Sequence, residues 1–257
     1  MLKLLTCALL LTPALAHAAD GCKYQAPRNA ALDLTGIHTL VVDIGSHNLH
    51  LNGTPGFTGQ LSGRACASSQ DRLNELRVTQ RREGDRLILT AESNSSNWSI
   101  SLFGLSRYAY MDLRVDVPAN LPVELAVGSG DADVVGIARL SSRTGSGDLH
   151  VHGISGRFDA QVGSGDIEAD GIGEIHVASI GSGDFRATGV SSDVQIGSIG
   201  SGSADLIKVG GNVIVDSIGS GDLSVDGVAH DLHVGKVGSG DVSHNGVAGH
   251  VDIPRED

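Results

Sequence analysis

The chain has 257 residues, with 36 glycines, only 3% aromatic residues and a formal net charge of −12 at pH 7. The excess acid lies in residues 121–257, which carry 7 basic and 20 acidic side chains, whereas residues 20–120 carry ten of each. We expect no binding of nucleic acid, because a surface this acidic would repel the phosphate backbone.

The first 18 residues have the pattern of a secretory signal peptide. Lys3 precedes an apolar run that extends to Leu15, and Ala16-His17-Ala18 is typical of a cleavage site. The run is too short to span a bilayer, and no other segment is apolar enough to do so. We therefore expect an exported protein without a membrane span, either periplasmic or secreted to the cell surface.

Export would leave two cysteines, Cys22 and Cys66, in an oxidising compartment. We expect them to form a disulfide that ties the N-terminal tail to the region after it. In the chain-entropy model, closing a loop of about 45 residues stabilises the folded state by about 4 kcal/mol.

Residues 19–120 are predicted to form an N-terminal β region. Residues 45–53, Gly-Ser-His-Asn-Leu-His-Leu-Asn-Gly, align with residues 145–153, Gly-Ser-Gly-Asp-Leu-His-Val-His-Gly, and therefore predict a degenerate rung of the repeat described below. Strand patterns follow, and prolines then mark a break before residue 123. These patterns cover residues 73–80, 86–91, 100–103 and 110–117. No helix is expected after the leader, and the pattern does not define how residues 54–120 fold.

Most aromatic residues precede the repeats. We interpret them as an aromatic-rich cap that closes the first regular rung. The alternative is a patch for a partner, because exposed aromatic rings supply contact area. The patch would consist of Trp98, Phe103, Tyr108 and Tyr110.

Residues 121–257 are predicted to form a regular solenoid of seven Gly-Ser-Gly-Asp-type rungs. A fixed period of 17–19 residues indicates such a repeat architecture. The copies begin at Gly128, Gly145, Gly163, Gly181, Gly200, Gly219 and Gly238, and the copy at Gly200 ends in Ser203 instead of Asp.

Each copy continues with the alternation of a short strand, as in Leu149-His150-Val151, followed by a second glycine and a second strand. The glycines suit corners that need a positive φ or leave no room for a Cβ. Stacked rungs would pair each strand with its copy in parallel. The pattern therefore predicts an all-β parallel β-helix, or β-solenoid, with 17–19-residue rungs.

The aspartates of the repeat are the sharpest candidates for a chemical site. Unit charges about 4.8 Å apart repel by about 1 kcal/mol even in water, and a divalent cation would relieve this repulsion. However, the calcium-binding nonapeptide has a different spacing, Ser203 interrupts the series and the other corner shows no matching acid. We therefore expect each Asp to bond N–H groups of its own turn, with calcium binding as the weaker alternative. The candidate residues are Asp131, Asp148, Asp166, Asp184, Asp222 and Asp241.

Enzymatic chemistry has no support in the sequence. It contains no nucleophile motif, phosphate loop or zinc motif, and Gly-x-Gly occurs only as the repeat turn. The outward positions do not gather the acids and bases that a polysaccharide hydrolase or lyase needs. The ten histidines after the leader form no metal constellation and are expected on the solvated surface, where they would gain charge together near pH 6. We expect no enzyme activity and no cofactor.

The repeated Val/Ile-Gly-Ser-Gly-Asp unit, with residues 115–118 and 121–123 leading into it, resembles the bacterial putative-adhesin β-strand-repeat family and the related GIN-domain proteins. The resemblance covers roughly residues 38–253. It implies a right-handed, single-stranded parallel β-helix and provides no catalytic residues to carry over.

These observations together predict an exported, non-enzymatic β-solenoid that acts as a structural or adhesion/interaction module of the bacterial envelope, with a protein or glycan as partner. The alternatives are a carbohydrate-binding or carbohydrate-processing β-helix, or an envelope accessory that responds to acid or cations. Pro254 and the charges after it are expected to blunt the last strand edge, so we expect no filament from this end.

Overall fold

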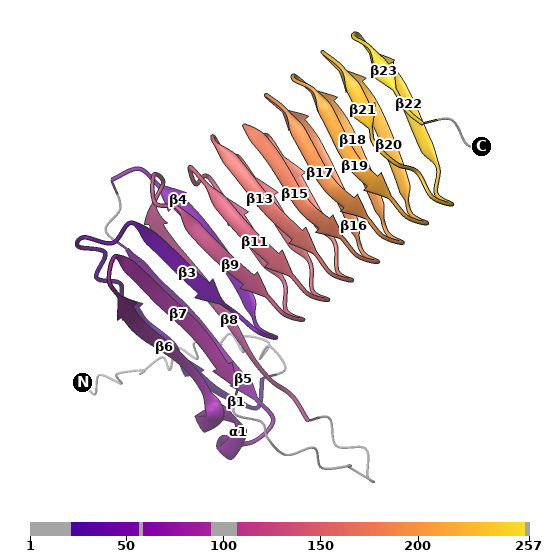
Figure 1. Ribbon diagram of the computed structural model, residues 1–257. Coiled ribbons are helices and arrows are strands. Elements are labelled where there is room, and N and C mark those ends of the chain that lie inside the picture. Colours follow the sequence, from indigo (N-terminus) through magenta and orange to yellow (C-terminus); the bar gives the residue numbers. More distant parts are fainter. Residues whose placement is uncertain (1–21, 57–58, 94–106, 255–257) are drawn as a thin grey trace, which may run out of the picture.

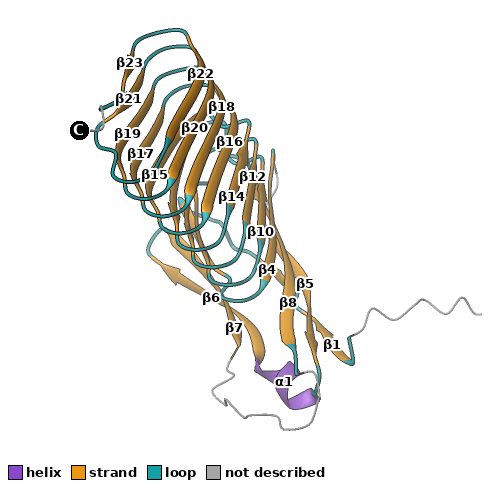
Figure 2. Ribbon diagram, turned by 90° about the vertical axis from the view of Figure 1, so that its right-hand side faces the viewer, coloured by secondary structure: helices purple, strands orange, loops and turns teal. Residues whose placement is uncertain are grey.

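The computed structural model describes residues 22–56, 59–93 and 107–254, so the predicted signal peptide lies outside the described residues. Two β-sheets face each other along a rod, with the N-terminal region at one end and the last rungs at the other (Figure 1). Figure 2 shows the turns that join the two sheets on both sides of the rod. The predicted all-β parallel solenoid is confirmed.

One sheet, here called sheet A, has 12 strands and contains the short strand that follows each Gly-Ser-Gly turn. Its members in chain order are β1 (Tyr24–Pro27), β2 (Ala30–Ala31), β4 (Asn48–Thr54), β5 (Gln60–Ala67), β8 (Ala109–Pro118), β10 (Ala132–Val135), β12 (Leu149–His152), β14 (Ile167–Asp170), β16 (Asp184–Val190), β18 (Ser203–Val209), β20 (Asp222–Val228) and β22 (Val242–Val247).

The second sheet, sheet B, has 11 strands and contains the strand that follows the second corner of each rung. Its members are β3 (Thr39–Asp43), β6 (Leu76–Glu83), β7 (Arg86–Ser93), β9 (Val123–Val127), β11 (Leu140–Thr144), β13 (Arg157–Val162), β15 (Glu174–Ile180), β17 (Val194–Ile199), β19 (Val213–Ile218), β21 (Leu232–Val234) and β23 (Val251–Asp252).

The regular rungs stack in the register that the repeat predicts. Leu149 of β12 pairs with Ala132 of β10 on one side and with Ile167 of β14 on the other, and all these pairings are parallel. The alternating apolar positions point inward and form one hydrophobic cluster that extends from Leu32 to Val234. Phe158 and Phe185 are both fully buried in it, so the thin core accommodates two aromatic rings.

The glycines serve two different kinds of corner, as the sequence predicts. At the Gly-Ser-Gly turn the backbones of adjacent rungs touch: a Cβ added to Gly165 would overlap the carbonyl oxygen of Gly147. At the second corner the backbone has a positive φ, as at Gly153 with +70°. Lys208 takes this place in the rung that begins at Gly200, and its φ of +59° is the only positive non-glycine φ among the described residues.

The degenerate copy at residues 45–53 is a rung of the same stack, which confirms the alignment. Leu49 of β4 pairs with Ala132 of β10, and the N–H of Gly128 donates to the carbonyl of Gly45. The turn of this rung carries His47 where the regular rungs have their second glycine, and Gly130 stacks directly against it.

The described residues between 54 and 120 complete the rod below this rung. Strand β7 pairs in parallel with β3, and β8 pairs in parallel with β4, so β7 and β8 make one more rung. Strand β5 pairs antiparallel with β8, and β6 pairs antiparallel with β7, which ends the parallel stacking. After β8 the chain passes the β3–β4 rung and enters β9, which pairs with the other edge of β3.

One prediction for this region is wrong. The segment 73–80 was expected to be a single strand, and no helix was expected outside the leader, but residues Gln70–Glu75 form the short helix α1. Ser69 caps this helix, and its side chain accepts a hydrogen bond from the N–H of Arg72 at 3.4 Å. A serine cap stabilises the first helical turn locally and overrides the strand pattern. The strand β6 begins only at Leu76.

The predicted disulfide joins Cys22 to Cys66, with a Cα–Cα distance of 5.6 Å. Cys66 lies on β5 and is fully buried. The strand β1 follows Cys22 directly and pairs antiparallel with β5. The bridge therefore ties the N-terminal tail to the end of sheet A, as the sequence predicts.

The other end of the rod is open. The edge strands there are β22 and β23. In β22, His244 stands at a position that is apolar in the earlier rungs, and it pairs with Val225 of β20. His244 is exposed, and Val242 and Val251 are only partly buried. A polar residue at this position and the two-residue strand β23 oppose the addition of further strands, and the expectation that this end forms no filament stays a prediction.

Two inward positions of β11 are polar instead of apolar. Ser142 and Thr144 are buried, and neither hydroxyl has a hydrogen-bond partner. Their neighbours in the same columns are apolar: Leu125 and Ala160 flank Ser142, and Val127 and Val162 flank Thr144.

We expect Thr144→Val to raise the free energy of unfolding by about 1 kcal/mol, because it removes a buried hydroxyl without a partner at nearly constant volume. Urea denaturation followed by circular dichroism checks this. Ser141→Ala, at an exposed position of the same strand, is the control and should change stability by less than about 0.5 kcal/mol. A destabilised Thr144→Val variant would show that the hydroxyl makes a bond that the structure does not contain.

Candidate functional site

The aspartates of the Gly-Ser-Gly-Asp turns form a ladder between rungs. The carboxylate of Asp131 accepts the backbone N–H of Asp148 at 3.1 Å, and Asp148 accepts that of Asp166 at 3.2 Å. Asp166 repeats this bond to Asp184, and Asp222 repeats it to Asp241. The prediction that each Asp bonds N–H groups of its own turn is thus wrong. Each carboxylate accepts an N–H of the next rung instead, because parallel stacking brings that N–H within hydrogen-bond distance.

Ser203 shows what the carboxylate contributes. Its hydroxyl and its N–H both donate to Asp184, but it offers no carboxylate to the following rung. The N–H of Asp222 donates instead to the backbone carbonyl of Gly202 at 3.2 Å. The ladder is therefore interrupted at one rung without any loss of stacking.

A second ladder runs along the opposite corner, which the sequence analysis considered free of acids. Asp193 accepts the N–H of Asn212 at 2.7 Å, Asn212 accepts that of Asp231 at 3.2 Å, and Asp231 accepts that of His250 at 2.7 Å. In the sequence, these residues stand directly before the sheet B strands of the last rungs. The pattern is not evident there, because the residue types are mixed and the earlier rungs lack them.

The ladders give the carboxylates a structural role that needs no cation. The carboxylates already accept backbone N–H groups, and among the described residues no group of three or more His, Cys, Asp or Glu side chains is placed to hold a metal ion. We therefore expect the melting temperature to be the same in millimolar calcium and in excess chelator. A calcium-dependent rise in the melting temperature that Asp166→Asn abolishes would contradict this.

The outer faces carry charged side chains in cross-rung pairs. Most histidines are exposed, as expected, whereas His176 is half-buried, and several face a carboxylate on the adjacent rung. These pairs are His50–Asp133 (2.7 Å), His150–Glu168 (3.5 Å), His152–Asp170 (3.0 Å), His176–Asp159 (3.3 Å) and His233–Asp252 (2.9 Å). Arg186 and Asp205 form a similar pair at 2.9 Å. Exposed pairs of this kind contribute little stability individually, about 0–1 kcal/mol.

His47 is the exception among the histidines. It is buried, its Nδ1 accepts the N–H of Met111 at 3.3 Å, and its Nε2 has no partner. Burial lowers the pKa of His47 below its ordinary value. The folded protein therefore binds fewer protons at this site than the unfolded chain, and protonation of the unfolded chain favours unfolding.

We expect the free energy of unfolding to fall as the pH drops below about 6.5, where an unfolded histidine begins to gain a proton. In His47→Asn this pH dependence should be smaller, although the variant loses stability at all pH values because the ring leaves a void. Urea denaturation at about pH 7.5 and pH 5.5 measures the difference. His230→Asn, at an exposed position, is the control, and equal slopes in both variants would contradict the assignment.

The aromatic patch considered in the sequence analysis is only partly described. Trp98 and Phe103 lie outside the described residues. The rings of Tyr108 and Tyr110 are 6.3 Å apart. The hydroxyl of Tyr108 accepts the N–H of Lys23, and Tyr110 pairs with Cys66 of β5. These two tyrosines therefore lie beside the disulfide, and a role of all four residues as a partner patch stays a prediction.

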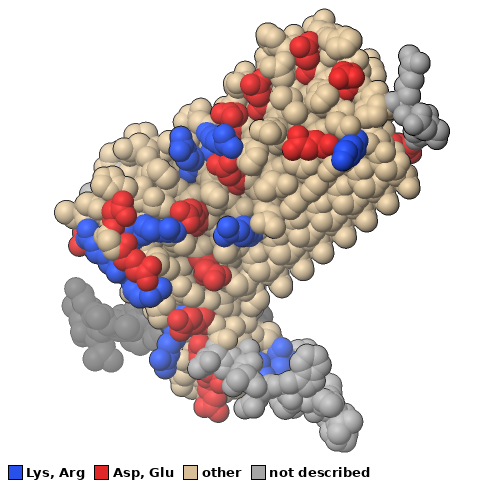
Figure 3. All heavy atoms as spheres, in the orientation of Figure 1, with Lys and Arg blue, Asp and Glu red and all other residues tan. Residues whose placement is uncertain are grey.

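The charged side chains on one face of the rod occur in separate groups (Figure 3). An open hollow of about 820 Å³ lies at the second corner of the rungs that contain β11 to β17. We call it the arginine hollow. Its residues are Arg139, Ser155, Gly156, Arg157, Asp159, Gly173, Glu174, Ser191 and Ser192.

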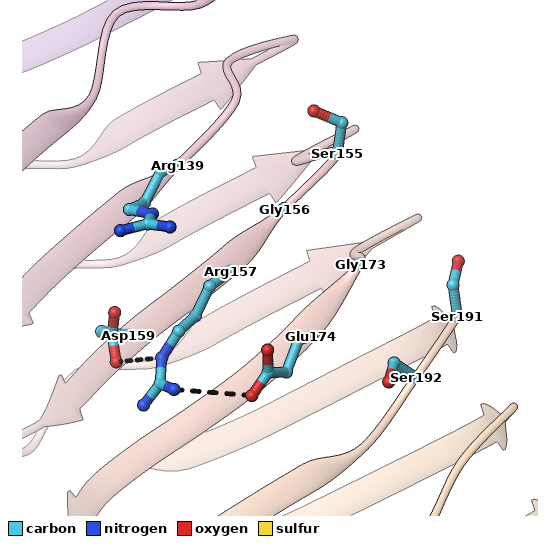
Figure 4. Close-up of a pocket in the computed structure, with 9 residues that line it drawn as sticks. All are labelled: Arg139, Ser155, Gly156, Arg157, Asp159, Gly173, Glu174, Ser191 and Ser192. Carbon is cyan, nitrogen blue, oxygen red and sulfur yellow. Dashed lines mark hydrogen bonds and ion pairs between the residues drawn. The ribbon is translucent and has the colours of Figure 1, made fainter.

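Within this hollow, Arg157 is held by two carboxylates. Its Nε donates to Asp159 at 2.8 Å, and its Nη1 donates to Glu174 at 3.4 Å (Figure 4). The hydrogen bond to Asp159 raises the pKa of Arg157, so this side chain stays charged. Arg139 lies beside this group, and no interaction joins it to the other residues drawn in Figure 4. No sequence motif reveals this site, because its lining residues come from four successive rungs.

Comparisons with known proteins cover most of the chain. A family model described as Toastrack DUF4097 matches residues 37–257. A search of the curated proteins found no match. Three solved structures are similar in most of their length, and their low identities limit the likeness to the fold.

A putative adhesin from Bacteroides fragilis is 14% identical, with 90% of this chain and 98% of that chain covered and a TM-score of 0.50. A putative adhesin from Parabacteroides merdae is 12% identical, with coverages of 87% and 97% and a TM-score of 0.49. A putative lipid binding protein from Parabacteroides distasonis is 16% identical, with coverages of 87% and 97% and a TM-score of 0.48.

Proposed function

The chain belongs to the Toastrack DUF4097 family, and from this premise we propose that it is an exported, non-enzymatic β-solenoid that acts as an adhesion or interaction module of the bacterial envelope. The observation that carries the proposal is the arrangement of polar side chains on the rod. They lie in cross-rung ladders and pairs on open faces, which suits contact with a large partner.

Catalysis finds little support in this arrangement. A hydrolase or lyase needs an acid and a base that converge on one bond in a site that excludes water. Here the carboxylates of the turns accept backbone N–H groups, and the hollows are open to solvent. The Bacteroides fragilis protein is described as a putative adhesin, which agrees with a contact role.

The Cys22–Cys66 disulfide supports export, because it suits an oxidising compartment. Within the described ranges, no helix is long and apolar enough to cross a membrane. We propose that residues 1–18 are removed and that the mature protein is periplasmic or at the cell surface. Intact-mass analysis of the protein from fractionated cells tests this, and full-length protein in the cytosol would contradict it.

We also propose that the two parts of the chain have different roles. Residues 19–120 would close one end of the rod, and residues 121–257 would provide the regular outer faces. The antiparallel strands β5 and β6 support the first part, because they end the parallel stacking. The edge strand β6 also carries arginines, and charged edges discourage further strand pairing.

Carbohydrate binding is the second candidate, and the arginine hollow favours it, because the hollow gathers hydrogen-bond donors on an open surface. A panel of immobilised polysaccharides and envelope proteins tests both candidates when binding and product release are measured in the same samples. We expect binding without turnover. Release of oligosaccharide in proportion to the amount of protein would establish an enzyme and overturn the proposal.

A further inference from the structure

We propose that the arginine hollow binds the carboxylate group of an acidic saccharide. The inference rests on the proposed interaction role and names the class of ligand for one site on the rod. The hollow contains two arginines in a strongly acidic half of the chain, and one of them, Arg139, has no ion pair among the described residues. Residues 121–257 carry only 7 basic side chains against 20 acidic ones, and two of those 7 line this hollow.

The guanidinium of Arg139 supplies the free charge. It is exposed, and within the described residues it has neither an ion pair nor a hydrogen bond. Arg157 supplies a second, fixed donor group. Asp159 and Glu174 occupy its Nε and Nη1, which leaves Nη2 for a ligand and holds the side chain in place. A guanidinium held in advance loses less freedom when it binds, and its planar fork matches a carboxylate.

The local charge favours a single negative charge over a double one. Two arginines face two carboxylates in the hollow, and His176 contacts Asp159 at 3.3 Å from the neighbouring strand. A carboxylate adds one negative charge beside Arg139. A phosphate monoester adds between one and two negative charges, and Asp159 and Glu174 would therefore repel it more strongly.

The remaining lining indicates a saccharide and not a peptide. Ser155, Ser191 and Ser192 present exposed hydroxyls, and Gly156 and Gly173 leave the floor without side chains. No apolar or aromatic side chain lines the hollow. A peptide would therefore find no apolar side chain to pack against, whereas the hydroxyls of a sugar find donors and acceptors. The hollow is also open across several rungs, so that a polymer can enter sideways (Figure 4).

The experiment measures this site directly. The full-length mature protein is titrated with an oligouronate, with a neutral oligosaccharide of equal length, with a glutamate-rich peptide and with inorganic phosphate. Affinity is measured by calorimetry, and the Nε–Hε resonances of the arginines are followed by NMR. We expect the oligouronate to bind most tightly, to shift the Arg139 and Arg157 resonances and to bind more weakly as salt increases.

Variants test the assignment of the residues. Arg139→Gln should weaken oligouronate binding about tenfold to a hundredfold, because it removes charged hydrogen bonds. Arg157→Lys should also weaken oligouronate binding, because an ammonium keeps the charge but lacks the planar pair of N–H donors that a guanidinium presents. Arg143→Gln is the matched control: Arg143 is an exposed arginine of the neighbouring strand β11 that does not line the hollow, and its replacement should leave the affinity unchanged.

Oligouronate binding that is unaffected by Arg139→Gln would overturn the inference, as would equal or tighter binding of phosphate or of the acidic peptide. Tight binding of the neutral oligosaccharide alone would also overturn it, but would leave the proposed interaction role intact. Release of shortened oligouronate during the titration would instead overturn the proposed non-enzymatic function.

Discussion

Replacing Gly165 with alanine is expected to lower the free energy of unfolding by about 3 kcal/mol or more. The reason is a backbone contact between rungs: the added Cβ would overlap the carbonyl oxygen of Gly147 and approach the carbonyl carbon of Ser146. Backbone atoms cannot rotate away as a flexible side chain can. The rungs must therefore move apart, which weakens the ladder bonds on both sides.

Urea denaturation measures the loss, and hydrogen exchange shows whether it spreads from the rung of β14 to its neighbours. Rungs of a solenoid contact only adjacent rungs, so the loss of protection should be largest there. Ser164→Ala, at an exposed position of the same turn, is the matched control and should be nearly neutral. A Gly165→Ala variant as stable as this control would disprove the explanation of the glycines as contact points.

Removal of the disulfide is expected to have the second large effect. The Cys22→Ala/Cys66→Ala variant should lose up to about 4 kcal/mol, because the bridge closes a long loop in the unfolded chain. The sequence separation of the two cysteines is 44 residues. The loss should be concentrated in β1 and β5, which the bridge joins, and should reach the last rungs only weakly.

Native-state hydrogen exchange in these two strands, together with urea denaturation, measures the effect. Wild-type protein treated with a reductant should behave like the double variant, since reduction breaks the bridge without removing side-chain atoms. Two reactive thiols in protein prepared under oxidising conditions would be the contrary result, because they would show that the bridge does not form.

The sequence predicted the fold where one physical rule acts in every rung. Alternation such as Leu149-His150-Val151 orients side chains in and out, and the glycine at each turn reflects contact between backbones. Even the degenerate copy at residues 45–53 could be found, because it keeps the alternation. Its His47 takes the place of the second glycine, and the ring accepts the N–H of Met111 of β8.

Other features depend on neighbours that a single rung does not show. The bond of Asp131 goes to the next rung, so its partner could not be read from its own turn. The helix α1 depends on a local serine cap within an otherwise strand-like segment. The arginine hollow combines side chains from different rungs, and no short motif contains it. Sequence reasoning therefore predicted the scaffold better than its surface sites.

The path of the chain past the β3–β4 rung has a consequence for synthesis. This rung is made early, but both of its neighbours come later: β7 and β8 on one side, β9 and β10 on the other. While the chain grows, β3 and β4 therefore have exposed edges until residue 135 has been added. From there on each new rung finds a finished template, so assembly of this rod has one slow, non-local step near its beginning and proceeds by addition afterwards.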